Sequence, residues 1–424
     1  MSTIGCTLLV SDGAPSTQDP ALGSVGEATA IRRLADLLVG FGANVQPGQI
    51  LAISSEPGKE ALTRELATSA YRAGAKFVDV WYFDLHVKRA RLLHSSDEDL
   101  PFVPEWYGHR LVQLGEQHAA RIALTGPVEP GLLSDVDPRR AGIDQLPALK
   151  EGIAIVNAAT TNWCGAPCPT PGWARLVFPE LEPDAAYAKL WEQILHVMRL
   201  DEDDPVATWR ARADHLESMA ARLTERHFDA VRFTGEGTDL TIGLLPSSTW
   251  VAARFTTVDG IVHMPNLPTE EVFTTPDPLR TDGFVTATKP LSVGGSIVEG
   301  LRVRFEGGRA VQIDADSGAE VMRAYAARDD GSSFLGEVAL VDREGRIGPL
   351  RTTFYDTLLD ENAASHIALG SGYALGVGDA ADLDRVNHSA IHVDFMIGSN
   401  EIEVDGLAPD GDVTPLLRGG SWQI

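Results

Sequence analysis

The feature that most constrains this fold is the alternation of short apolar runs with longer helical patterns in the first half of the chain. Runs typical of buried strands occupy residues 49–55, 76–83, 121–126 and 152–158. Residues 58–75 repeat their apolar positions every three or four residues, which predicts an amphipathic helix between the first two strands. Strand–helix–strand alternation predicts a mostly parallel sheet covered by helices. No G-x-G-x-x-G motif follows the first run, so a dinucleotide site is not supported.

Further helices are predicted on both sides of this alternation. One begins near Glu27, and residues 1–28 before it read as a weakly patterned extension. Residues 183–200 predict another helix. The acidic run 201–205 has two interpretations, a metal site or the cap of the next helix over 206–226, and we favour the cap.

After about residue 228 the pattern changes to short strand-like segments bounded by Gly and Asp. Residues 301–315 predict a hairpin across a Gly-Gly turn, and 318–328 predict a helix. A chain of 424 residues is also long for one core. We therefore predict a mixed α/β fold of two domains: an N-terminal α/β domain with a mostly parallel sheet (1–228) and a C-terminal α+β domain with antiparallel strands (229–424).

The charge balance excludes several classes of partner. The chain has 35 Lys and Arg against 60 Asp and Glu, a formal net charge of −25, so neither nucleic acid nor an anionic membrane is an expected partner. No apolar run reaches the roughly 20 residues of a membrane helix, and no secretory signal is recognisable. The expected location is cytoplasmic. Cys164 and Cys168 read as ordinary thiols in a Pro-rich loop, with a redox pair as the alternative.

The segment "NHSAIHVDFMIGS" (387–399) contains the first candidate ligands. If it forms a strand, His392 and Asp394 share one face, because side chains alternate along a strand. Burying a carboxylate is costly unless a basic group, a hydrogen-bond network or a metal compensates it. A structural pair and a metal site remain equally open at this point.

Other candidates lie in three further segments. His366 and Tyr373 are seven residues apart, which on a helix would place them on one face, although a core histidine is the simpler interpretation. Glu337 lies within the strand-like run "LGEVALV". Glu270 and Glu271 are adjacent, so only one of them can face inward from an extended segment. Such an oxygen- and nitrogen-rich set suits divalent cations, although no compact motif such as H-E-x-x-H is present.

These segments together resemble the thermophilic-type metallo-aminopeptidases, the aminopeptidase T/AmpS/PepS family. The resemblance runs from about residue 36 to the C-terminus, and its most specific blocks are "PTEEVFT", "LGEVALV", "DENAASHIALGSGY" and "HVDFMIG" in that order. It implies an exopeptidase that binds two divalent metal ions, Zn, Co, Mn or Mg, and that acts on peptides as a homodimer. The metal ligands that it implies are Glu271, Glu337, His366, His392 and Asp394.

The resemblance also suggests catalytic roles. Glu337 would bridge the two ions, and Tyr373 would donate a hydrogen bond to the tetrahedral oxyanion. Glu270 is either an anchor for the substrate amine or a solvated neighbour, and His263 is a lesser candidate for the pocket wall. The alternative function is a ring-opening dioxygenase of a hydroxylated pyridine with a single Fe(II), which would need only His366, His392 and Asp394.

Overall fold

The computed structural model describes residues 26–144, 146–147 and 150–424. Most of the extension predicted over residues 1–28 therefore lies outside the described residues, as does Cys6. The first described helix is α1 (Glu27–Leu37), which continues through a short π-helical segment, η1 (Leu38–Gly42). The predicted helix start near Glu27 is thus confirmed.

The N-terminal half contains a four-stranded parallel sheet in the order β2-β1-β3-β4. Its strands are β1 (Ile50–Ser55), β2 (Phe77–Tyr82), β3 (Ala120–Thr125) and β4 (Trp163–Pro167). Its helices are α2 (Glu60–Arg72), α3 (Leu85–His94), α4 (Glu105–Glu116), α5 (Pro138–Ile143), α6 (Lys150–Asn157), α7 (Pro171–Val177), α8 (Pro183–Val197) and α9 (Pro205–Arg226). Gly74 has φ +91°, a left-handed conformation that ends α2 within the predicted range.

One predicted strand is wrong. Residues 152–157 belong to α6. The fourth strand is β4, and Cys164, predicted to lie in a loop, belongs to this strand. The run "GIAIVNA" is short and apolar, and periodicity alone does not separate a buried strand from a buried helix of that length. In the folded chain Ile155 packs close to Gly115 of α4, so α6 covers a helix instead of extending the sheet.

The C-terminal half is built from antiparallel sheets, as predicted. A five-stranded sheet has the order β18-β17-β16-β10-β7, and an eight-stranded sheet has the order β15-β14-β11-β6-β5-β19-β20-β21. The bounds of the first are β7 (Val251–Ala252), β10 (Glu271–Thr274), β16 (Leu335–Val341), β17 (His366–Gly370) and β18 (His392–Met396). The bounds of the second are β5 (Ala230–Gly235), β6 (Thr238–Leu244), β11 (Pro276–Thr286), β14 (Arg302–Glu306), β15 (Arg309–Asp314), β19 (Glu403–Leu407), β20 (Val413–Arg418) and β21 (Ser421–Trp422).

Smaller elements complete this half. The predicted hairpin over 301–315 is the pair β14–β15, and the helix predicted at 318–328 is α10 (Ala319–Ala326). The remaining elements are β8 (Phe255–Thr256), β9 (Val262–His263), β12 (Leu291–Val293), β13 (Ser296–Val298), α11 (Thr357–Glu361) and the 3-10 turns η2 (Gly348–Leu350), η3 (Ala374–Gly376) and η4 (Ala380–Arg385).

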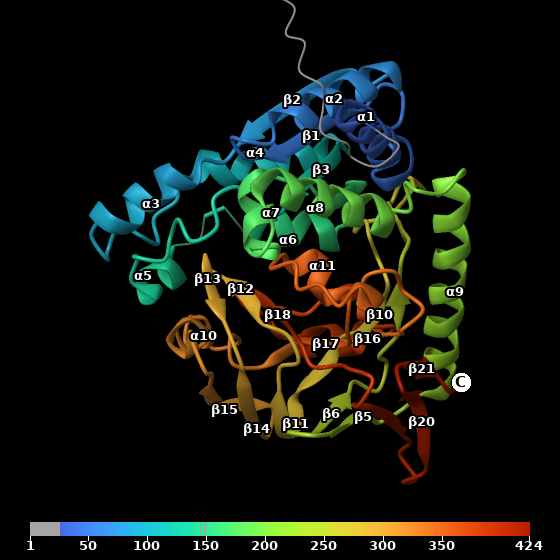
Figure 1. The fold of residues 1–424 in the computed structure, drawn as a ribbon. Helices are drawn as coiled ribbons and strands as arrows, with labels where there is room; N and C mark the ends of the chain where they lie inside the picture. Colours follow the sequence, from blue (N-terminus) through green and yellow to red (C-terminus); the bar gives the residue numbers. More distant parts are fainter. Residues whose placement is uncertain (1–25, 145, 148–149) are drawn as a thin grey trace, which may run out of the picture.

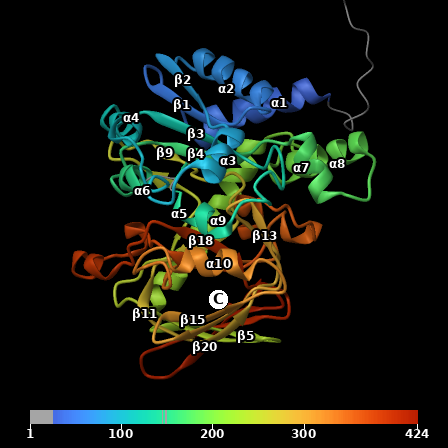
Figure 2. The same cartoon turned by 90° about the vertical axis from the view of Figure 1, so that its left-hand side faces the viewer.

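The two halves are stacked, with the five-stranded sheet between the parallel sheet and the large antiparallel sheet (Figures 1 and 2). The short helix α11 lies between the N-terminal helices and strands β16–β18 (Figure 1). One hydrophobic core cluster contains residues from both halves, from Ala30 to Leu417. A division into two domains after residue 228 therefore remains a proposal. Across the described ranges, no helix combines the length and apolar character needed to cross a bilayer.

Candidate metal centre

Three neighbouring strands bring the predicted ligands together. In the sheet register Ala368 of β17 faces Glu337 of β16 on one side and Asp394 of β18 on the other, and Gly370 faces His392. Paired residues share a face, and so do residues two apart on a strand. His366 and the three predicted ligands of β16 and β18 therefore point to the same side of the sheet, above the small side chain of Ala368.

The side chains on this face lie within ligand range of one another. His366 Nε2 is 3.0 Å from Glu271 Oε2 and 3.5 Å from Glu337 Oε1. His392 Nε2 is 3.7 Å from Glu337 Oε2 and 3.4 Å from Asp394 Oδ1. All five predicted ligand positions thus form one cluster, and Glu337 lies between the two histidines with one oxygen toward each.

A bulge in β16 directs Glu337 into this cluster. The pairing of β16 with β17 shifts register between Leu335 and Glu337, at Gly336. A Cβ atom on Gly336 would lie 2.4 Å from the carbonyl oxygen of Ser371, so only glycine fits there. Bulges of this kind turn a side chain to a new direction and are common beside active sites.

Tyr373 reaches the cluster by a route that the sequence interpretation did not foresee. The helical spacing proposed for His366 and Tyr373 is wrong, because His366 begins strand β17 and Tyr373 lies beyond its end, before η3. Gly370, with φ +109°, interrupts the regular chain between them. The Tyr373 ring lies 5.0 Å from the ring of His392 and 6.2 Å from that of Phe273.

Glu361 is a member of the cluster that sequence reasoning missed. It ends α11, is 9% exposed, and offers an oxygen within 4.8 Å of ligand atoms of His366 and Asp394. The available signal was its position in "LLDENA", a carboxylate in an otherwise buried turn five residues before His366. Neither strand alternation nor helical spacing relates Glu361 to the sheet, because α11 is a separate element.

Glu270 does not belong to the cluster, and both roles suggested for it are wrong. Its side chain is fully buried, so it is not a solvated neighbour. Its oxygens accept hydrogen bonds from Arg199 Nη2 at 2.9 Å and Arg212 Nε at 2.6 Å. Arg212 also binds Asp342, at 3.1 Å. Glu270 therefore points away from Glu271 into a buried ion-pair network with α9 and the turn after α8.

The crowding of acidic groups dominates the electrostatics of the cluster. Burial raises the pKa of Glu361 well above its usual value, and the nearby carboxylates of Asp394 and Glu271 raise it further. Burial alone would lower the pKa of His392, but Asp394 and Glu337 outweigh it and raise the pKa to about 10. Without a cation, four carboxylates share the positive charge of only two imidazoles.

Several observations test whether a divalent cation fits these residues. His366 Nδ1 lies 3.1 Å from the Ala364 carbonyl oxygen and His392 Nδ1 lies 2.8 Å from that of Ser371. Histidine ligands use such contacts to hold the ring while the Nε2 atom faces the metal. Glu271 Oε2 is buried, and its 3.0 Å contact with His366 Nε2 does not have the geometry of a hydrogen bond. In the described part of the chain, the charged partners of Glu271, Glu337 and Asp394 are histidines alone. The donor set therefore fits divalent cations.

Three overlapping groups of ligand atoms could hold a cation. They are Glu271–Glu337–His366, Glu337–His392–Asp394 and Glu361–His366–Asp394.

Other sequence candidates lie elsewhere. Asp204 caps α9 by accepting from Ala207 N at 3.0 Å, which confirms the capping interpretation of the acidic run. His263 is buried between Trp163 and Phe255, with ring centroids 6.4 and 6.2 Å away, and lies apart from the ligand cluster. Burial raises the pKa of Cys168 to about 12, which keeps its thiol protonated and disfavours the redox alternative.

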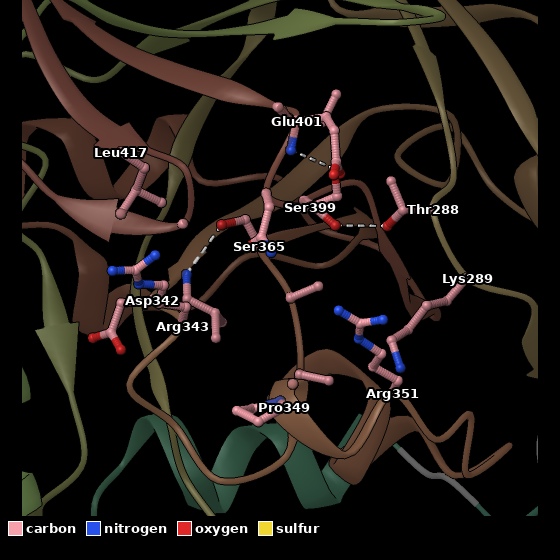
Figure 3. Close-up of a pocket in the computed structure, with 18 of the residues that line it drawn as sticks. Thr288, Lys289, Asp342, Arg343, Pro349, Arg351, Ser365, Ser399, Glu401 and Leu417 are labelled. Atoms are coloured by element: carbon pink, nitrogen blue, oxygen red, sulfur yellow. Dashed lines mark hydrogen bonds between the residues drawn. The ribbon is translucent and has the colours of Figure 1, made fainter.

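A cavity of about 720 Å³ lies near the cluster but does not contain it. Its wall includes Ser365, the residue before His366, together with Lys289, Arg343 and Arg351 (Figure 3). None of the ligand candidates lines it.

Comparison with known proteins gives consistent matches over nearly the whole chain. Residues 27–422 match the thermophilic metalloprotease (M29) family. Aminopeptidase T of Thermus thermophilus is 40% identical over 93% of this chain and 98% of its own length. Aminopeptidase AmpS of Bacillus subtilis is 36% identical over 92% of this chain and 97% of its own length. The solved structure of wild-type AmpT from Thermus thermophilus has a TM-score of 0.84 at 40% identity, covering 93% of this chain and 99% of that one.

Proposed function

This chain belongs to the thermophilic metalloprotease (M29) family, and from that premise we propose that it is a metallo-aminopeptidase that releases N-terminal residues from peptides with two divalent cations. The metallo-aminopeptidase class follows from the family and from relatives that are named aminopeptidases. The observation that carries the two-cation proposal is the position of Glu337. One of its oxygens faces His366 and the other faces His392, so its carboxylate is shared by two of the three ligand groups.

The residues proposed to hold the cations lie on both sides of the Glu337 carboxylate. Glu271 and His366 lie on one side, His392 and Asp394 lie on the other, and Glu361 adds an oxygen near His366 and Asp394. When bound, divalent cations lower the pKa of a water toward neutrality and polarise the scissile carbonyl. Zn²⁺, Co²⁺, Mn²⁺ and Mg²⁺ all accept this donor set to some degree.

Tyr373 is proposed to stabilise the developing oxyanion. Burial raises the pKa of its hydroxyl well above the usual value, and the charges of Glu337 and Asp394 raise it further. The hydroxyl therefore stays protonated at neutral pH and donates a hydrogen bond. A single such donor is typically worth about 10²–10³ in kcat.

The free amine of the substrate is proposed to bind at one of the cations. The other partner considered for it, Glu270, is already paired with Arg199 and Arg212.

The homodimer and the cytoplasmic location are further parts of the proposal. The homodimer rests on the family resemblance, and the location rests on the acidic composition. Size-exclusion chromatography with light scattering measures the oligomeric state, and a fusion to a fluorescent protein reports the location.

The iron dioxygenase alternative is not supported. The relatives described above are aminopeptidases. A three-ligand iron site would also leave Glu271, Glu337 and Glu361 as uncompensated buried carboxylates.

The test uses the variant Glu337→Gln, with Glu344→Gln as the control, because Glu344 is exposed on the loop after the same strand. We expect the wild-type protein and the control to cleave Leu-p-nitroanilide and a chelator to abolish this activity. Glu337→Gln is expected to be inactive and to bind fewer metal ions per chain. Wild-type turnover by a folded Glu337→Gln variant would refute the assignment. One iron per chain with oxygen uptake on a dihydroxypyridine would refute the peptidase proposal.

A further inference from the structure

The carboxyl edge of the parallel sheet is occupied by a side chain from the other half of the protein. Open parallel sheets bind their ligands in the crevice outside the carboxyl ends of the strands. Here β3 ends at Thr125, Gly126 follows it, and the side chain of Asp356 occupies the position at which such a sheet would bind a ligand. Its Oδ2 accepts from Gly126 N at 2.8 Å, and its Oδ1 accepts from Thr125 Oγ1 at 3.3 Å. Asp356 is 8% exposed, and its hydrogen bond with Gly126 N is buried.

The crevice is shaped for this occupant. Gly126 has φ +86°, and a Cβ atom there would lie 2.6 Å from the ring of Trp173, so the close approach requires glycine. Trp173 is fully buried and donates from Nε1 to the carbonyl oxygen of Phe354 at 2.5 Å. Lys59 is 1% exposed, with its Nζ 3.1 Å from the Leu124 carbonyl oxygen. The N-terminal half thus presents an amide and a hydroxyl to one carboxylate. The Lys59 ammonium, whose ion-pair partner is Glu56 at 3.4 Å, adds a favourable charge only at longer range.

Asp356 connects this crevice to the helix that carries Glu361. Its Oδ1 also accepts from Leu359 N at 3.3 Å, which caps the N-terminus of α11. Within the same turn, Asp360 accepts from Phe354 N at 3.0 Å and from Asp356 N at 3.3 Å. The segment 354–361 is therefore held at several points, and its last residue is the cluster member Glu361.

The contact continues from α11 to a second ligand. Asn362 Oδ1 accepts from Glu270 N at 2.6 Å, and its Nδ2 donates to the Leu358 carbonyl oxygen at 2.9 Å. Glu270 immediately precedes Glu271, so the position of α11 also constrains the backbone that presents Glu271. A chain of buried hydrogen bonds thus runs from the end of β3 to two of the proposed ligands.

We propose that Asp356 is a positioning residue through which the N-terminal half sets the metal affinity of the C-terminal half. By binding in the crevice at the end of β3, Asp356 fixes the position of α11. The position of α11 in turn fixes Glu361 and the start of β10. The N-terminal half supplies none of the six proposed ligands, yet the cluster depends on it. This inference rests on the metal site of the proposed function.

The expected size of the effect follows from outer-shell partners in other metal sites. Residues that orient a ligand without touching the ion typically change metal affinity by about 10–100-fold when they are removed. Asp356→Ala removes all three acceptor contacts of the side chain. Asp356→Asn keeps an oxygen toward Thr125 and Leu359 but turns an NH₂ group toward Gly126 N, so an intermediate loss is expected.

Thr170→Ala is the matched control. Thr170 lies at the same seam, where its Oγ1 accepts from Trp173 N and donates to the Pro127 carbonyl oxygen. It makes no contact with α11 among its hydrogen bonds in the described structure. Its loss should lower stability by the cost of a helix cap, about 1 kcal/mol, without changing metal affinity.

The experiment titrates Zn²⁺ and Co²⁺ into the metal-free full-length protein with a competing chelator, together with thermal unfolding. We expect about 10–100-fold weaker binding for Asp356→Ala, an intermediate value for Asp356→Asn, and the wild-type constant for Thr170→Ala despite its lower midpoint. Wild-type affinity in a folded Asp356→Ala variant would overturn the inference. If that variant does not fold, wild-type affinity in Asp356→Asn overturns it and a weakened constant supports it.

The same titration separates this inference from the proposed function. Metal affinity is measured without any peptide. A wild-type protein that binds metal but cleaves no peptide would refute the peptidase proposal and leave the role of Asp356 intact.

Discussion

The adjacent residues Glu270 and Glu271 should respond in opposite ways to the same substitution. Glu270 is fully buried in ion pairs with Arg199 and Arg212. Glu271 is buried among other carboxylates, with His366 as its only charged partner in the described structure. We expect Glu270→Gln to destabilise the metal-free protein, and Glu271→Gln to leave it as stable as the wild type or more stable.

The magnitudes follow from what each carboxylate contacts. Removing one partner of a buried ion pair costs about 3–5 kcal/mol. Glutamine keeps one acceptor, and Arg212 keeps Asp342, so we expect a loss near the lower end, about 3 kcal/mol, for Glu270→Gln. Glu271→Gln removes one of four crowded negative charges and leaves no cation unpaired. Its penalty appears only with metal, because a ligand at 100 times its dissociation constant stabilises the folded state by about 2.7 kcal/mol.

The assay is guanidinium unfolding of the wild type, both variants and the exposed control Glu344→Gln, each with a chelator and with saturating Zn²⁺. Glu270→Gln should unfold at a lower midpoint in both conditions and should keep its shift on adding metal. Glu271→Gln should match the wild type in chelator and gain little from metal. The metal-dependent shift, more than the absolute midpoint, distinguishes the two residues.

Two results would refute this reasoning. A wild-type midpoint for Glu270→Gln in chelator would mean that its ion pairs do not stabilise the fold. A Glu271→Gln variant that is as unstable in chelator as Glu270→Gln, or that keeps the full metal shift, would mean that Glu271 is a structural residue and not a ligand.

Three further predictions follow from the same geometry. Tyr373→Phe should lower kcat by about 10²–10³ with unchanged metal affinity, measured by steady-state kinetics beside a metal titration, and an unchanged kcat would remove Tyr373 from the mechanism. Glu361→Gln should lower the metal retained after dialysis, measured by elemental analysis, and a wild-type content would exclude it as a ligand. Burial lowers the pKa of His263 to about 4, below its unfolded value of 6.5, so the unfolded chain binds more protons between these values. The free energy of unfolding therefore falls by about 3 kcal/mol as the pH drops from 6.5 toward 4, and it shows no such loss above pH 6.5. Because His263→Phe removes this titration, the variant should have a flatter stability–pH curve in that window. An equally steep curve would contradict this account.

Much of the fold could be predicted because its signals are local. The parallel sheet, the helix over residues 183–197, the cap at Asp204 and the hairpin β14–β15 all follow from periodicity and turn chemistry within short windows. The wrong strand prediction at residues 152–158 also comes from relying on local periodicity. A seven-residue apolar run fits either a strand or a helix, and the choice depended on α4, which lies about 40 residues earlier in the chain.

The candidate site was predictable to the extent that its ligands lie on regular strands. His392 and Asp394 share a face because side chains alternate along β18, and this follows from the sequence once the strand is recognised. Tyr373 was assigned to the correct neighbourhood by resemblance, but the helical spacing first considered for it was wrong. It approaches His392 because the chain turns back at Gly370, a change of direction that spacing does not encode.

By itself, the sequence determined that one half has a parallel sheet with helices and the other has antiparallel sheets. It also determined which segments carry the oxygen and nitrogen donors, and the family. Only the tertiary structure decided which of Glu270 and Glu271 faces the cluster. Adjacent strand residues point to opposite sides, and the choice was made by Arg199 and Arg212, 71 and 58 residues away, which pair with Glu270. The same holds for Glu361, which joins the cluster because the crevice at the end of β3 seats Asp356. Local patterns arise from neighbours along the chain, whereas the partner of a buried charge is decided by packing between distant segments.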